Sequence, residues 1–147
     1  MFTIEDVLRL SNRVREYYGR QLKNKIPNYS FSPNEISILI LLSNNPSIKT
    51  STQLTIVLGV SKGLVSRSVD SLLRKGLIET YADPSDKRVS YIELSKNSVV
   101  VLDKIQFEIK KINQTLFSNI SKEEFNQMIG VLEKMNKGIE EVENEGA

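Results

Sequence analysis

The short stretch "DPSDKR", residues 83–88, combines side-chain types that suit surface binding chemistry. Two acids and a proline precede a basic pair, and the alternating run "VSYIEL" follows. One interpretation is a plain surface hairpin. The other is a device that holds Arg88 against a binding partner, and the remaining sequence has to decide between them.

Catalytic designs are limited by two residue types that the sequence lacks. It contains no cysteine and no histidine. Without cysteine there is no disulfide and no thiol redox switch, and without either residue a structural zinc site is not expected. Histidine general-base chemistry and the Ser-His-Asp and Cys-His triads are excluded as well. Carboxylates and lysines do not converge into a constellation, so we expect neither an enzyme nor a cofactor.

Length and composition indicate one globular domain over residues 1–147, large enough to bury a core. Hydrophobic residues make up 39% and charged residues 26%, an ordinary balance for a soluble protein. No apolar run approaches the roughly 18 residues of a membrane span, and the early charges are unlike a signal peptide. We therefore expect a cytoplasmic protein without a membrane partner.

The charge distribution is uneven, although the net charge is only +2. Basic side chains outnumber acidic ones up to residue 96, and acids collect in the final "GIEEVENEGA". A basic front is compatible with nucleic-acid binding by one portion of the chain. The alternative is an ordinary solvated face.

Apolar spacing and capping signals predict the first helices. The spacing is helical over residues 3–25, with Thr3 as the expected N-cap and "PNYS" as the end of the helix. In "SPNEISILILLS", Ser32, Pro33 and Glu35 form a capping box ahead of a helix that is apolar nearly all round. Such a helix is expected at the centre of the fold.

Two shorter helices separated by a turn are expected next. Thr50 with Gln53 forms a second capping box, and Gly59 ends the short helix that it opens. Ser61 caps the following helix, "KGLVSRSVDSLLRK", which Gly76 terminates. The pair is predicted to be a helix-turn-helix.

The alternating runs "LIETYA" and "VSYIEL", joined by turn formers, predict a β-hairpin. Ile48 is expected to add a short third strand beside it. Long apolar stripes after Ser95 predict two C-terminal helices, whose spacing resembles a coiled-coil seam. The predicted fold class is mainly α with a small β-hairpin wing (α+β): a winged helix-turn-helix over about 32–94 between terminal helices over about 3–25 and 95–143.

The stretch "QLTIVLGVSKGLVSRSVDSLLRKGLI", residues 53–78, resembles the helix-turn-helix core of the MarR family of winged-helix transcription regulators. The matching positions are Leu54, Leu58, Gly59, Ser61, Val65, Ser66, Arg67, Asp70, Leu72, Gly76, Leu77 and Ile78. The family's wing signature, Asp-x-Arg followed by Leu-Thr, is matched by Asp86, Arg88, Leu94 and Ser95. The resemblance extends over nearly the whole chain and implies a DNA-binding regulator.

The helix after Ser61 has an apolar inward face and an outward polar face. An α-helix fits the major groove of DNA, where residues near its N-terminus reach base edges. Ser61 caps a first turn without acids, which leaves the positive helix end free for a phosphate. Arg67 is the first candidate for a base contact, with a phosphate clamp as its alternative role. The expected DNA-contacting residues of this helix are Ser61, Lys62, Gly63, Ser66 and Arg67.

Thr50, Ser51 and Gln53, at the start of the preceding helix, are candidate phosphate contacts. Capping of that helix is their alternative role and needs no DNA. Both roles suit hydroxyl and amide side chains at a helix N-terminus.

The wing is expected to place Lys87 on a phosphate and Arg88 in the minor groove. Resemblance implies that Asp70 faces the wing arginine. We therefore expect Asp70 and Asp86 to orient Arg88. The alternative is that both are surface acids without a role.

The terminal helices carry more apolar positions than one winged helix of this size can cover. A homodimer explains them better than a monomer core, and the resemblance implies the same. Two recognition helices would then lie about one DNA turn apart, roughly 10–10.5 bp, on a pseudo-palindrome. The resemblance alone implies a small aromatic or anionic effector between the terminal helices and the winged helix. The residues expected to line its cleft, or else to be ordinary core and surface residues, are Arg13, Tyr17, Tyr18 and Tyr29.

The leading prediction is a homodimeric, sequence-specific regulator that binds double-stranded DNA. Repression and activation are both compatible with such binding. The alternative, from a different class, is a winged-helix protein-interaction module without DNA readout.

Overall fold

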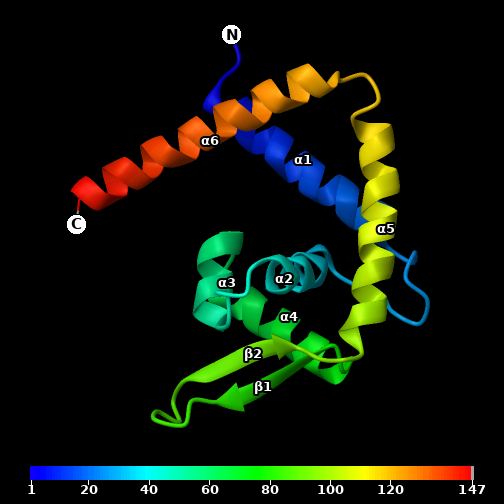
Figure 1. Ribbon diagram of the computed structural model, residues 1–147, viewed down its shortest axis with the longest axis vertical. Coiled ribbons are helices and arrows are strands. Elements are labelled where there is room, and N and C mark those ends of the chain that lie inside the picture. Colours follow the sequence, from blue (N-terminus) through cyan, green and yellow to red (C-terminus); the bar gives the residue numbers. More distant parts are fainter. Residues whose placement is uncertain (147) are drawn as a thin grey trace. The chain divides into compact units, whose positions relative to one another are not determined.

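A computed structural model describes residues 1–146, which form six helices and a two-stranded antiparallel sheet (Figure 1). The fold class expected from the sequence, mainly helical with a β-hairpin wing, is confirmed. In chain order the elements are α1 (Ile4–Leu22), α2 (Pro33–Asn44), α3 (Ser51–Leu58), α4 (Lys62–Arg74), β1 (Ile78–Ala82), β2 (Ser90–Leu94), α5 (Ser98–Leu116) and α6 (Lys122–Glu145).

The chain divides into two compact units, and the boundary between them falls within α5. The first unit is Met1–Lys110 and contains the helix-turn-helix and the hairpin; the second begins at Lys111. A single domain over the whole length stays a prediction. Across residues 1–146, none of the helices combines the length and the apolar character that a membrane span requires.

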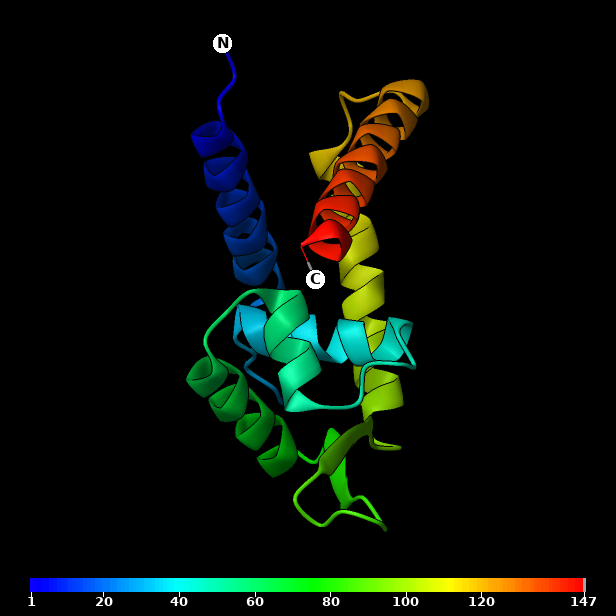
Figure 2. The ribbon, with the colours of Figure 1, turned by 90° about the vertical axis from the view of Figure 1, so that its left-hand side faces the viewer.

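Helix α2 lies at the centre of the first unit, as its composition predicts. It packs against α1, α4 and β2, and Ile38 and Leu39 are fully buried. Leu54 of α3 and Leu72 of α4 are also fully buried. Figure 2 shows α4 and the hairpin at the same end of this unit, with the tip of the hairpin directed away from the helices. The core therefore fixes the orientation of α4 and leaves the wing tip in solvent.

The predicted capping signals are confirmed. Ser32 Oγ accepts a hydrogen bond from the Glu35 backbone N–H at 3.2 Å, and the Glu35 carboxylate accepts one from the Ser32 N–H in return. Helix α1 ends at Leu22, three residues before the predicted end at about Lys25. Two left-handed asparagines, with φ of 64° at position 24 and 68° at position 28, turn the chain there.

The hairpin pairs Ile78 with Leu94 and continues in antiparallel register to Ala82 and Ser90, next to the connecting loop. The third strand expected at Ile48 is wrong, since the described sheet has two strands. One hydrogen bond remains, from the Ile92 backbone N–H to the Lys49 carbonyl at 2.7 Å. A single backbone contact attaches this segment to the hairpin but does not extend the ladder.

Helices α1 and α2 approach each other closely at Gly19. A β-carbon at this position would lie 2.6 Å from Pro33 Cγ, far inside van der Waals contact. The absence of a side chain at Gly19 therefore permits this crossing, and the proline ring at the first turn of α2 fills the space.

A buried ion pair joins the start of α2 to the end of α4. The Lys75 ammonium contacts the Glu35 carboxylate, and the side chains are only 23% and 9% exposed. Lys75 also donates to the Ser30 carbonyl at 2.7 Å and lies 4.9 Å from the centre of the Phe31 ring. These contacts fix the end of α4 on the central helix α2.

The second unit contains the end of α5 and all of α6. Phe117 and Phe125 pack edge to face, with ring centres 5.1 Å apart. The apolar stripe expected on the last helix is present but unburied: Leu132, Met135 and Ile139 are each at least half exposed. A stripe of this size is unusual on a free surface.

Candidate nucleic-acid interface

Helix α4 presents a polar outer face near its N-terminus. Ser61 is the N-cap, because its hydroxyl accepts the Leu64 N–H at 3.2 Å, and no acid lies in the first turn. Val65, Val69 and Leu72 are buried against the core, as predicted. The residues predicted to contact DNA all lie exposed on the other side: Lys62, Gly63, Ser66 and Arg67.

A free helix N-terminus with exposed cationic side chains suits anion binding. Its backbone N–H groups and the helix dipole carry partial positive charge. Lys62 and Arg67 add two full charges on the same exposed stretch. Ser68, in contrast, is buried, and its hydroxyl donates to the Leu64 carbonyl at 2.9 Å. Ser68 was not among the predicted site residues, and its buried internal hydrogen bond makes it part of the core.

The start of α3 is held by its own capping contacts. Thr50 Oγ1 accepts the Gln53 N–H at 3.2 Å, and Gln53 Oε1 accepts the N–H groups of Thr50 and Lys49 at 3.1 and 2.7 Å. The Gln53 amide also donates to the Ser47 carbonyl at 3.2 Å. Both the oxygen and the nitrogen of the Gln53 amide are therefore engaged in hydrogen bonds within the fold. Ser51 lies at the first position of the helix and is half-buried.

The wing tip carries an arginine held by a single acid. Arg88 donates to the Asp86 carboxylate from its backbone N–H at 3.0 Å and from Nε at 3.1 Å. The Arg88 side chain is 91% exposed, and the neighbouring Lys87 is also exposed. Asp70, expected to share this role, is exposed on α4, and no hydrogen bond or ion pair links it to Arg88 within residues 1–146. The orienting contact therefore comes from Asp86.

Asp83 accepts more hydrogen bonds than any other acid of the wing, although it was not among the predicted site residues. Its Oδ1 accepts hydrogen bonds from the Ser85 N–H at 2.8 Å, the Ser85 hydroxyl at 2.6 Å and the Asp86 N–H at 3.2 Å. Its Oδ2 accepts the Tyr91 hydroxyl at 2.6 Å. An Asp followed by Pro and Ser is a turn signal that fits this hydrogen bonding. The contact with Tyr91, in contrast, can be predicted only when the register of the hairpin is known.

These contacts shift the pKa values of three side chains in the wing. The Ser85 hydroxyl, with the Tyr91 hydroxyl and the Ser85 N–H, holds the pKa of Asp83 well below its ordinary value of 3.8. Hydrogen bonds from Arg88 lower the pKa of Asp86. The bond to the Asp83 carboxylate raises the pKa of the Tyr91 phenol. Both acids are therefore ionised at neutral pH and act as fixed acceptors.

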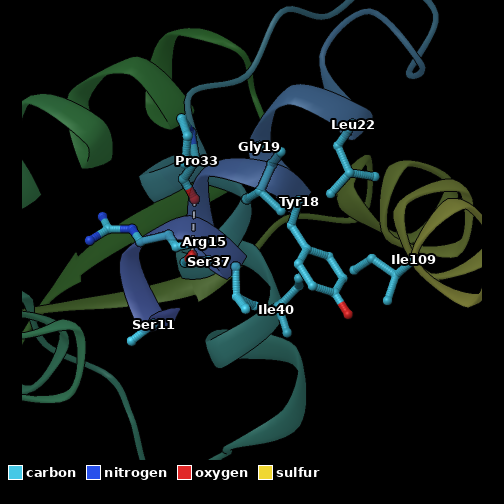
Figure 3. A pocket seen from close by; sticks show the side chains of 11 residues that line it. Ser11, Arg15, Tyr18, Gly19, Leu22, Pro33, Ser37, Ile40 and Ile109 are labelled. Carbon is cyan, nitrogen blue, oxygen red and sulfur yellow. Dashed lines mark hydrogen bonds between the residues drawn. The ribbon is translucent and has the colours of Figure 1, made fainter. Parts of the chain in front are cut away.

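A cavity of about 500 Å³ lies between α1 and α2 in the first unit (Figure 3). Of the four residues predicted to line an effector cleft, Tyr18 lines this cavity, whereas Arg13, Tyr17 and Tyr29 do not. Arg13 is exposed on α1, and Tyr29 stacks on the Phe31 ring at 5.4 Å instead. The lining residues are Ser11, Val14, Arg15, Tyr18, Gly19 and Leu22 of α1, Pro33, Ile36, Ser37 and Ile40 of α2, and Ile109 of α5.

The cavity is mostly apolar, with polar groups at its edges. The Tyr18 ring lies beside Ile109 in Figure 3, and the Arg15 guanidinium points away from that ring. Arg15 was missed by sequence reasoning, although its spacing of three from Tyr18 places both on neighbouring turns of one helix face. The part of the chain that the structure describes contains no group of three or more acids placed to hold a metal ion.

The segment that contains the residues predicted to contact DNA matches a known protein family. The model of the MarR family matches residues 31–90, from the cap of α2 to the start of β2. This chain carries a MarR-family domain. The matched segment of the MarR-family domain contains every residue considered above for DNA contact, from Thr50 to Arg88.

Solved structures share the fold over most of the chain. A crystal structure of MarR has a TM-score of 0.76 at 16% identity, covering 90% of this chain and 96% of the other. MepR of S. aureus, in complex with DNA, has a TM-score of 0.69 at 24% identity, covering 94% and 97%. A MarR mutant from E. coli, in complex with operator DNA, has a TM-score of 0.70 at 23% identity, covering 86% and 91%. At these identities the likeness shows the fold, helices outside the MarR-family domain included.

Proposed function

We propose that this protein is a transcription regulator that binds double-stranded DNA in a sequence-specific manner. The observation that carries the proposal is the joint exposure of the acid-free start of α4 and of Arg88, which Asp86 holds at the wing tip. A helix of this kind fits the major groove, and an arginine beside it fits the minor groove. The DNA complexes of the structurally similar MepR and MarR support the assignment.

The proposed active form is a homodimer on a pseudo-palindromic operator. Apolar side chains of α1 and α6 are exposed along the helices, including Leu8 at 59% and Ile139 at 56%. Stripes of this kind are the usual material of a two-fold interface between identical chains. Light scattering should give the mass of two chains, and Ile139→Glu should shift the equilibrium toward the monomer. A wild-type mass of one chain at micromolar concentration would remove the dimer from the proposal.

Salt dependence tests the DNA contacts. For each phosphate neutralised, log K should fall by about 0.9 per unit of log salt on B-DNA. Arg88→Ala should weaken binding and flatten that slope, whereas Arg20→Ala, an exposed arginine of α1, serves as the matched control. Arg67→Ala should relax sequence preference at one position per half-site, by roughly 1–3 kcal/mol if the contact is bidentate.

Selection of bound duplexes from a random pool tests sequence readout and symmetry together. Two related half-sites about one helical turn apart are the expected result. A native protein that binds no duplex at low salt would instead favour the protein-interaction module, the alternative function.

The cavity of the first unit supports a second proposal, a small aromatic or anionic effector. Its volume suits a compact ligand, Tyr18 supplies a phenol, and Arg15 also lines the cavity. Benzoate, the simplest probe that combines both features, should shift the NMR signals of residues that line the cavity and alter the affinity for DNA. Shifts scattered over exposed surface residues would speak against this site.

A further inference from the structure

We propose that Tyr91 and Asp83 form a latch that orders the wing tip and thereby positions Arg88 for DNA. The latch is the hydrogen bond from the Tyr91 hydroxyl to Asp83 Oδ2 at 2.6 Å. It joins the first residue after β1 to the second residue of β2 across the hairpin. Neither residue needs to contact DNA in this role. The ordering of the wing tip does not depend on the proposed function, whereas its effect on DNA affinity rests on that function.

The latch is continuous with the contacts that hold Arg88. Asp83 Oδ1 accepts the Asp86 backbone N–H at 3.2 Å, so the same carboxylate that binds Tyr91 places Asp86. The Asp86 carboxylate then accepts Nε and the backbone N–H of Arg88 at 3.1 and 3.0 Å. An unbroken series of hydrogen bonds therefore leads from the sheet to an otherwise exposed guanidinium.

The tyrosine is itself held in place by the hairpin. Tyr91 faces Tyr81 directly in the strand register, and their ring centres are 5.3 Å apart. Such a cross-strand aromatic pair restricts the ring, so the hydroxyl reaches Asp83 without further loss of side-chain freedom. Tyr91 is half-buried, whereas Tyr81 is more exposed.

Order in the free protein matters because a flexible loop must lose its freedom on binding. The loop between the strands contains seven residues, 83–89, and only two backbone hydrogen bonds, Asp83 N–H to the Val89 carbonyl and Val89 N–H to the Asp86 carbonyl, close it. The Asp83 carboxylate adds four more acceptor contacts within the wing. A pre-ordered tip reduces the entropy cost of placing Arg88 in a groove.

Tyr91→Phe removes the hydroxyl and retains the ring. A typical net hydrogen-bond contribution predicts duplex affinity about two- to tenfold weaker. The slope of log K against log salt should not change, because no phosphate contact is lost. Tyr81→Phe is the matched control, since it removes a hydroxyl from the facing ring and leaves the Asp83 contact intact.

Tyr91→Phe in an Arg88→Ala background shows whether the loss of duplex affinity acts through the position of Arg88 or by another route. If the latch acts through Arg88, Tyr91→Phe has little further effect on affinity once the arginine is absent. An equal loss in both backgrounds, or no loss in either, overturns the proposal.

NMR relaxation of the free protein tests the latch independently of DNA. The Ser85 and Asp86 amides should become more mobile in Tyr91→Phe and remain rigid in Tyr81→Phe. Unchanged order at these amides overturns the latch even if the protein binds DNA. A mobile loop in a protein without duplex affinity would instead keep the latch and refute the proposed function.

Discussion

The ion pair between Glu35 and Lys75 makes a stability prediction that depends on burial. Replacing Lys75 by Met keeps an unbranched apolar stem over the Phe31 ring but removes the charge. The Glu35 carboxylate, 9% exposed, then loses its cation, and the Ser30 carbonyl loses a donor at 2.7 Å.

The size of the effect follows from these losses. Removing one partner of a fully buried pair costs about 3–5 kcal/mol, and the 23% exposure of Lys75 places this pair at or below the lower end. We expect Lys75→Met to lower the free energy of unfolding by about 2–3 kcal/mol. For a chain of this length that corresponds to a Tm lower by roughly 4–12 °C.

Two further variants identify the cause. Lys137→Met removes one partner of a surface pair, 75% and 64% exposed, and should cost no more than about 0.5 kcal/mol. Glu35→Gln combined with Lys75→Met should be more stable than Lys75→Met alone, because the uncompensated buried charge is gone. Urea unfolding at one fixed protein concentration measures all variants. The reasoning is refuted if Lys75→Met and Lys137→Met cost the same, or if the double change is the least stable.

Three other substitutions or conditions test the fold and the wing. Gly19→Ala should lower the free energy of unfolding in urea by roughly 1 kcal/mol, because overpacking against Pro33 outweighs the gain in helix propensity. Gly138→Ala, where the added methyl group meets open space, should raise it. The opposite order of the two stabilities would contradict the close approach of α1 and α2 at Gly19. Ser61→Ala should cost about 1 kcal/mol by loss of the N-cap, and an unchanged unfolding midpoint would exclude that role. Because the pKa of Asp83 is lowered, its contribution to the stability of the wing is complete above the unfolded value of 3.8 and is lost as pH falls through the lower pKa of the folded state. Carbon NMR should therefore find the carboxylate still ionised just below pH 3.8, and an ordinary titration would contradict this.

Local signals in the sequence were sufficient to predict most elements. Capping boxes such as Ser32 with Glu35 use neighbouring residues only, so their geometry is readable from spacing. The same is true of Gly59, whose φ of 63° ends α3. Ile48 was misjudged because strand pairing depends on tertiary position, and one hydrogen bond from Ile92 is all that forms nearby.

The candidate site was predictable in part for the same physical reason. The exposed start of α4 follows from helical periodicity, and Asp86 lies two residues from the arginine that it holds. The Tyr91 contact with Asp83 spans eight positions and requires the strand register. The cavity residue Arg15 was missed because a helix face becomes a cavity wall only when its packing partner is known.

The charge of the wing makes orientation more important than attraction in the proposed complex. Residues 78–94 contain four acidic and two basic side chains, and Glu79 lies directly opposite Glu93 in the strand register. A segment with excess negative charge is repelled by phosphates at long range. Arg88 therefore contributes binding energy only when it points toward DNA and the acids point away or accept internal hydrogen bonds. Asp83 and Asp86 meet the second condition, because both carboxylates are engaged within the wing.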